Sequence, residues 1–147
     1  MEKNIPLMRK IIEHIETAPE TWKQSSWAYV EDPLGLPEAS NEVDREVYES
    51  WGYEDTVRVA DPNLCGTALC IAGHAVNMDT KVVFLVDDTG SASLAQEVAT
   101  GEVFDIETRA RELLGLTANE ASMLFDGDNS LNAIKDVVDE FESEWLN

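Results

Sequence analysis

Apolar residues near the N-terminus recur at the three- and four-residue spacing of one helix face. The stripe predicts an amphipathic helix from about Ile5 to Thr17, with Pro6 suited to its first turn. Ala18-Pro19 is expected to end this helix, and Trp22 and Trp27 to anchor the following turn to the core. The apolar face of the helix consists of Met8, Ile11, Ile12 and Ile15.

The last third of the chain combines helical spacing with capping residues. Asp105 is suited to cap a helix that ends at about Leu114, before Gly115. The run Thr117-Ala118-Asn119-Glu120 has the form of a capping box and opens a second helix that reaches about Phe125.

A final helix, capped by Asn129 or Ser130, has a pronounced acidic side. Its apolar positions are spaced by three and four residues, at Leu131, Ile134, Val138, Phe141 and Trp145. The acidic side carries Asp136, Asp139, Glu140, Glu142 and Glu144, which we take as candidate partner-binding residues.

Two segments in the middle have the alternation or β-branched content of strands. These are Thr56–Ala60 and Lys81–Val86, and we expect them to pair with each other. Asp87-Asp88-Thr89-Gly90 is a clear turn signal after the second strand. Small residues dominate from Ser91 to Thr100, which we interpret as a short helix or a loop.

Between these two strands lies the least polar long run of the chain, Cys65 to Val76. Thr67 is suited to cap a helix from about Ala68 to Asn77, buried on most sides. Gly73 lies inside this helix, where glycine costs roughly 1 kcal/mol against alanine, so we expect another helix to approach it closely.

These elements predict the fold class. We expect one domain over residues 1–147, of α+β class but mostly α. It would be a compact helical domain around a central buried helix, with a small two-stranded sheet. The length suits a single domain, and an apolar content of 44% is enough for a core.

The segment 31–55 resembles an acidic insertion. Its proline, glycine and acidic residues indicate a surface segment, partly loop and partly a short helix. One interpretation is a solvated acidic face, which is what most charge runs are. The other is a docking surface for a protein partner, with Tyr48, Trp51 and Tyr53 as aromatic anchors.

Charge restricts the classes of partner. Thirty acidic residues stand against ten basic ones, for a formal net charge of −20. Direct binding to nucleic acid through phosphates, or to an anionic membrane surface, is disfavoured. A protein partner with a basic surface is favoured instead. No apolar run approaches the roughly 20 residues of a transmembrane helix, and no signal peptide is recognisable, so we expect a cytoplasmic protein.

Cys65, Cys70 and His74 are the only candidates for metal or nucleophile chemistry in the central run. They could supply three zinc ligands, with His14 or a carboxylate as the fourth. Cys65 could instead act as a nucleophile with His14, or pair with Cys70 in a disulfide. The favoured interpretation is a pair of buried thiols that act as small hydrophobic groups, with His14 half-buried and no cofactor.

Three blocks of sequence together resemble a group of small acidic proteins of actinobacteria and their bacteriophages. The resemblance covers the N-terminal helix, the central run and the last third, but not the acidic segment 31–55. The group has no established activity, so the resemblance implies only a phage accessory or bacterial cytosolic protein. Members often carry Trp at the position of His74, which argues against an essential ligand or base there. The blocks are Leu7-Met8-Arg9-Lys10 to Trp22 with Gln24 to Trp27, Cys65-Gly66-Thr67 with Cys70-Ile71-Ala72-Gly73, and Leu114-Gly115-Leu116-Thr117 with Glu120-Ala121, Leu124-Phe125 and Asn129-Ser130-Leu131.

Charge and resemblance together lead to one functional hypothesis. We expect a non-enzymatic acidic accessory protein, phage-encoded, that binds a host or partner protein in the host cytoplasm. In a sharper form of the hypothesis, the protein is a nucleic-acid mimic whose ordered carboxylates imitate phosphates. The alternative is a metal-binding or cysteine-dependent enzyme centred on Cys65, Cys70 and His74.

Overall fold

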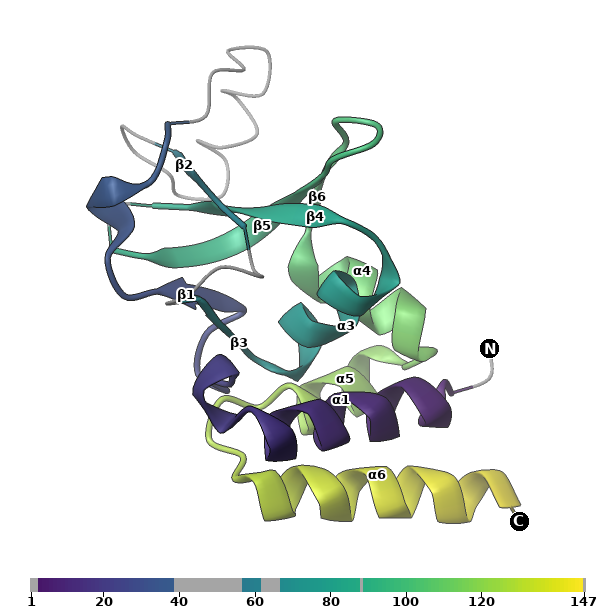
Figure 1. Ribbon diagram of the computed structural model, residues 1–147. Helices are drawn as coiled ribbons and strands as arrows, with labels where there is room; N and C mark the ends of the chain where they lie inside the picture. The colour runs from purple at the N-terminus through teal and green to yellow at the C-terminus, as the bar shows by residue number, and fades with distance from the viewer. Residues whose placement is uncertain (1–2, 39–56, 62–66, 88, 147) are drawn as a thin grey trace.

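A curled antiparallel sheet and a stack of helices beneath it make up the structure, a computed structural model (Figure 1). It describes residues 3–38, 57–61, 67–87 and 89–146. Two helices lie directly against the sheet, α3 (Ile71–Asp79) and α4 (Ile106–Leu114). The helix furthest from the sheet is α6 (Leu131–Leu146), which packs along α1 (Ile5–Thr17).

The N-terminal helix α1 forms as predicted, with the same bounds. The side chain of Asn4 accepts a hydrogen bond from the backbone N–H of Leu7, and proline occupies the first turn. The predicted stripe is buried, together with Ile5. A short 3₁₀ turn, Pro19–Thr21, follows, and Trp22 and Trp27 pack half-buried against the core as expected.

The predicted fold class is wrong, because the sheet has six strands rather than two. The order is β2-β4-β5-β1-β3, with β6 also paired to β5, and all pairs are antiparallel. The strands are β1 (Ala28–Val30), β2 (Arg58–Ala60), β3 (Thr67–Leu69), β4 (Val82–Val86), β5 (Ser91–Glu97) and β6 (Val103–Asp105).

The two predicted strands correspond to β2 and β4, and they pair as predicted. The predicted turn after β4 also forms, since Asp87 Oδ1 accepts hydrogen bonds from the backbone N–H groups of Thr89 and Ser91. The segment from Ser91, however, is neither helix nor loop. It is β5, which pairs with β4, β1 and β6. Cross-strand packing has overridden the weak strand preference of its small residues.

The central helix exists and is buried, but it begins later than predicted. Residues 71–76 of α3 are all buried. Thr67 belongs to β3 and does not cap the helix, whose N-cap is Cys70. A Cβ on Gly73 would collide with the carbonyl oxygen of Trp27. The close neighbour is therefore the chain entering β1, not another helix.

The last third is helical as predicted. Asp105 caps α4 by accepting from Thr108 N–H, and Gly115 ends it with a left-handed φ of 68°. The capping box opens α5 (Ala118–Leu124), where both Thr117 and Glu120 make their hydrogen bonds. Ser130 caps α6, because its hydroxyl accepts from the N–H of Ala133 at 3.1 Å.

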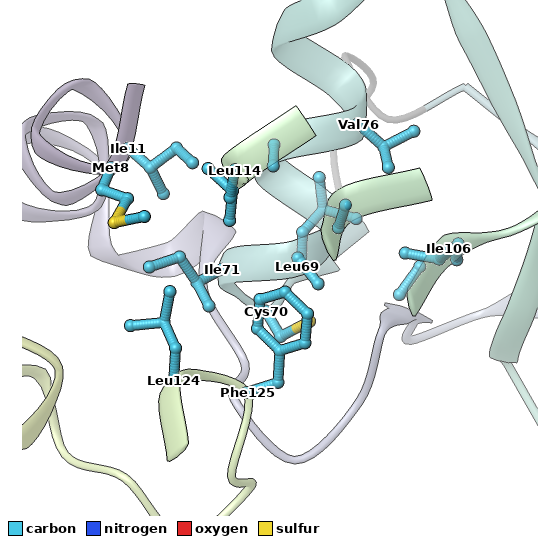
Figure 2. Packing of buried hydrophobic residues seen from close by; sticks show 14 of the residues in the cluster. Met8, Ile11, Leu69, Cys70, Ile71, Val76, Ile106, Leu114, Leu124 and Phe125 are labelled. Atoms are coloured by element: carbon cyan, nitrogen blue, oxygen red, sulfur yellow. The ribbon is translucent and has the colours of Figure 1, made fainter. Parts of the chain in front are cut away.

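The larger of two hydrophobic clusters in the described part of the chain joins the two layers. Figure 2 shows side chains of α1, the β3–α3 segment, α4 and α5 converging on each other. Of the acidic segment 31–55, the structure describes residues 31–38, which include a 3₁₀ turn at Pro33–Gly35.

Candidate functional site

The outer side of α6 presents a row of carboxylates. Ile134, Val138 and Phe141 are buried on the inner side. Carboxylates on the opposite side of the helix point away from the core, as a period of 3.6 residues requires. We call the set Asp136, Asp139, Glu140, Glu142 and Glu144 the acidic face; Glu142 is half-buried and the other four are exposed.

Arg9 of α1 neutralises one edge of the acidic face. Its Nη2 lies 2.6 Å from Asp139 Oδ1 and 3.1 Å from Glu142 Oε1. The hydrogen bond to Asp139 raises the pKa of Arg9, so the guanidinium stays charged. On the same flank Lys135 pairs with Glu16 at 3.3 Å. The α1 side of α6 is therefore charge-compensated.

The other edge of the acidic face lacks such compensation. Asp136, Glu140 and Glu144 form no ion pair with any residue in the described part of the chain.

The five carboxylates occupy residues 136–144, about 12 Å of helix at a rise of roughly 1.5 Å per residue. This is one carboxylate per about 2.5 Å when the two that Arg9 binds are counted. Duplex DNA carries one phosphate charge per about 1.7 Å and a single strand one per about 3.4 Å.

Of the predicted metal or nucleophile residues, Cys70 is fully enclosed. It is 1% exposed, and its thiol donates to the carbonyl oxygen of Trp27 at 3.7 Å. Burial raises the pKa of the thiol to about 12, so the thiol is protonated at neutral pH and is a poor nucleophile and metal ligand. This arrangement fits the interpretation of Cys70 as a small hydrophobic residue. Cys65 lies outside the described residues.

His74 is buried by α1 and the turn that follows it. It is 2% exposed, and its Nε2 lies 3.0 Å from the carbonyl oxygen of Thr21. Because a carbonyl oxygen can only accept, Nε2 carries the proton. Burial and, after it, the charge of His14 lower the pKa of His74 to about 4. The ring is therefore neutral at pH 7 and acts as a hydrogen-bond donor.

His14 is exposed rather than half-buried as predicted, with its ring centroid 5.1 Å from that of His74. Among the described residues, no three His, Cys, Asp or Glu side chains are grouped as a metal site would require. The proposed aromatic anchors Tyr48, Trp51 and Tyr53 lie outside the residues that the structure describes.

Gln24 is a residue whose importance the sequence did not indicate. Only 8% exposed, it uses its whole amide. Its Oε1 accepts from Trp22 Nε1 at 3.0 Å and from the N–H of Ile71 at 3.3 Å. Its Nε2 donates to the carbonyl oxygens of Leu124 and Asp126, both at 3.2 Å. One side chain thus ties the start of α3 to the loop that leads into α6.

Arg9 was also missed as part of the site. A cation on the flank of an amphipathic helix was visible in the sequence, and so was the acidic last helix. No local pattern shows that α1 and α6 are neighbours, because that depends on how the helices pack.

None of the helices in the described ranges is both long and apolar enough to cross a bilayer. Comparison of the chain with models of protein families, with curated proteins and with solved structures gives no match.

Proposed function

We propose that the chain is a non-enzymatic acidic accessory protein that binds a partner protein with a basic surface. The acidic face of α6 carries this proposal, because carboxylates on its uncompensated edge are exposed on the helix furthest from the sheet. The net charge of −20 supports the same class of partner, since opposite charge accelerates encounter and selects partners. The resemblance to phage and actinobacterial proteins supports a phage-encoded protein that acts in the host cytoplasm.

Nucleic-acid mimicry is the sharper form of the proposal. All five carboxylates of α6 together fall between single-stranded and duplex DNA in linear density, but Arg9 neutralises two of them. A nucleic-acid-binding protein that recognises phosphates by charge would meet the three unpaired carboxylates, about 6 Å apart along the helix axis, as a sparser row of negative charge. Added duplex DNA should then compete with the protein for such a partner.

Affinity capture tests the proposal. The full chain is used as bait in a lysate of the candidate host, at low and at high salt, against a triple variant Asp136→Asn/Glu140→Gln/Glu144→Gln. A matched control removes the same number of exposed carboxylates outside α6 and the segment 31–55, with Glu20→Gln/Asp79→Asn/Glu112→Gln. We expect a partner that wild type and control retain at low salt, that high salt or duplex DNA releases, and that the triple variant loses.

Two results of the capture would contradict the proposal. One is that nothing is retained specifically at low salt. The other is equal retention by the triple variant and the wild type, which would move the binding surface away from α6.

A thiol titration tests the alternative of a cysteine-dependent enzyme or metal protein. In a Cys65→Ser background, Cys70 should react with a thiol reagent only after denaturation, because its sulfur is enclosed and protonated. Elemental analysis of the purified wild-type chain is the companion measurement. Rapid reaction of native Cys70, or stoichiometric zinc, would favour the alternative.

A further inference from the structure

A small pocket lies where the segment before β1 meets the loop between α5 and α6. Its volume is about 170 Å³. Sites for small-molecule ligands usually span about 300–1,000 Å³, so this pocket has room for a single side chain. The lining residues are Gln24, Ser25, Ser26, Trp27, Phe125 and Gly127.

Two aromatic rings form the apolar part of the pocket. Trp27 and Phe125 meet edge to face, with centroids 5.9 Å apart and planes at 88°. Phe125 also belongs to the core, where Figure 2 shows it among the residues around Cys70. Trp27 is half-buried and also lines the pocket. Its contact with Phe125 holds the indole ring in place, so one wall of the pocket is aromatic.

Elsewhere the chain places its own cations on aromatic rings. Lys23 lies 4.0 Å from the ring centroid of Tyr29, and Arg109 lies 3.9 Å from that of Phe104. Within the described part of the chain, no lysine or arginine lies over Trp27 or Phe125 in this way. Lys23 is the cation nearest to the pocket residues in sequence. Because its ammonium lies over Tyr29, it does not occupy the pocket.

Two carboxylates adjoin the lining residue Gly127 in the sequence. Asp126 and Asp128 stand on either side of Gly127, and both are exposed. Asp126 Oδ1 accepts from the N–H of Asp128 at 2.9 Å, and the Asp126 carbonyl oxygen accepts from Gln24. The loop is therefore held in place before any ligand arrives, which lowers the entropic cost of binding.

We propose that this pocket receives one arginine side chain of the basic partner. The guanidinium stacks on Trp27 and donates to the carboxylates of Asp126 and Asp128. A planar, weakly hydrated guanidinium suits an aromatic wall beside carboxylates better than a compact ammonium does. That the arginine belongs to a protein partner rests on the proposed function. That the pocket binds arginine does not.

A titration of the ¹⁵N-labelled full chain with N-acetyl-arginine amide tests the pocket, followed by NMR. The neutral isostere N-acetyl-citrulline amide is the matched probe. The indole N–H signal of Trp27 is assigned with the Trp27→Phe variant. We expect saturable shifts of this signal and of the amides of Ser25, Ser26 and Gly127, with citrulline binding about fivefold more weakly or worse.

A double variant, Asp126→Asn/Asp128→Asn, removes the charge of both carboxylates. The amide oxygen introduced at position 126 can still accept the hydrogen bond that holds the loop. The variant should weaken arginine binding about fivefold or more, whereas Glu31→Gln/Asp32→Asn should leave it unchanged. Equal affinity for citrulline, tighter binding of N-acetyl-leucine amide, shifts spread over every acidic surface, or no saturable shift would each overturn the proposal.

The two proposals fail separately. Loss of arginine binding with continued capture of a partner through α6 would remove the pocket alone. Arginine binding without any captured partner would remove the proposed function alone.

Discussion

Gln24 carries four hydrogen bonds on one buried amide, each to a different element or turn. Such a side chain saturates its donors and acceptors within the protein. Its partners include the N–H of Ile71 and the carbonyl oxygens of Leu124 and Asp126. These groups would lose their partner together if the amide were removed, and burial makes an unpaired polar group costly.

Replacement of Gln24 by methionine keeps the length of the side chain but removes all four bonds. We expect the free energy of unfolding to fall by about 2–4 kcal/mol, measured by urea denaturation. Gln96→Met is the control, because Gln96 makes a single exposed bond to the carbonyl oxygen of Gly101 and should cost less than about 1 kcal/mol. Equal losses in the two variants would contradict the role assigned to Gln24.

His74 makes stability depend on pH. Its pKa is lowered from 6.5 to about 4 by burial first, so between these values the unfolded chain binds more protons than the folded one. Stability that is fully present above pH 6.5 should therefore be lost as the pH falls towards about 4, by up to about 3 kcal/mol.

The measurement is urea denaturation across this pH range for the wild type and for His74→Met. The methionine variant cannot titrate, so its stability should fall less on acidification, although both chains share the titration of their carboxylates. His14→Gln should keep most of the wild-type dependence, since burial is the larger cause of the shift. Parallel pH profiles for wild type and His74→Met would refute this account.

At the scale of elements, the helices were predictable because their signals are local. The stripe of α1, the capping box at Thr117 and the glycine after α4 each lie within a few residues of the helix they define. The acidic side of α6 follows from the same spacing. The candidate face could therefore be named from the sequence, although its partial neutralisation by Arg9 could not.

Most of the sheet was not predictable, because strand pairing is not local. Three of the missed strands, β1, β3 and β6, have three residues each, too few to show alternation. The fourth, β5, consists of small and polar residues that favour no one structure strongly. Thr67 was predicted to cap a helix, but it lies in β3 and pairs with Val30. That pairing joins distant segments of the chain, so no local pattern indicates it.

Gly73 in α3 gives a prediction with an unusual sign. Glycine-to-alanine changes inside a helix ordinarily stabilise it by roughly 1 kcal/mol. Here the new Cβ would meet the Trp27 carbonyl oxygen, so we expect Gly73→Ala to destabilise the protein by about 1–3 kcal/mol in thermal or urea unfolding. Gly35→Ala is the control, because nothing lies within 4 Å of a Cβ there. Stabilisation by Gly73→Ala would show that the two segments are not in contact.

At the scale of the whole molecule, like charges oppose folding. With a net charge of −20, screening by salt should stabilise the folded chain. Raising the salt concentration from about 0.01 M to about 0.1 M shortens the Debye length from about 30 Å to about 10 Å, and we expect the free energy of unfolding to rise. The triple variant Asp136→Asn/Glu140→Gln/Glu144→Gln should gain less from salt. Loss of stability on adding salt would instead indicate that attractive ion pairs dominate.

The position of β1 in the sheet bears on how the molecule assembles. Ala28 pairs with Leu69 on one side and with Ala92 on the other, so this early strand has both partners far along the chain. Loops must close before either ladder can form, and such high contact order slows folding. The capping signals of helices α4 and α5 are local, although α6 packs along the distant helix α1. During synthesis, the sheet would thus stay incomplete until β5 has been made. The chain would be most vulnerable to aggregation during that interval.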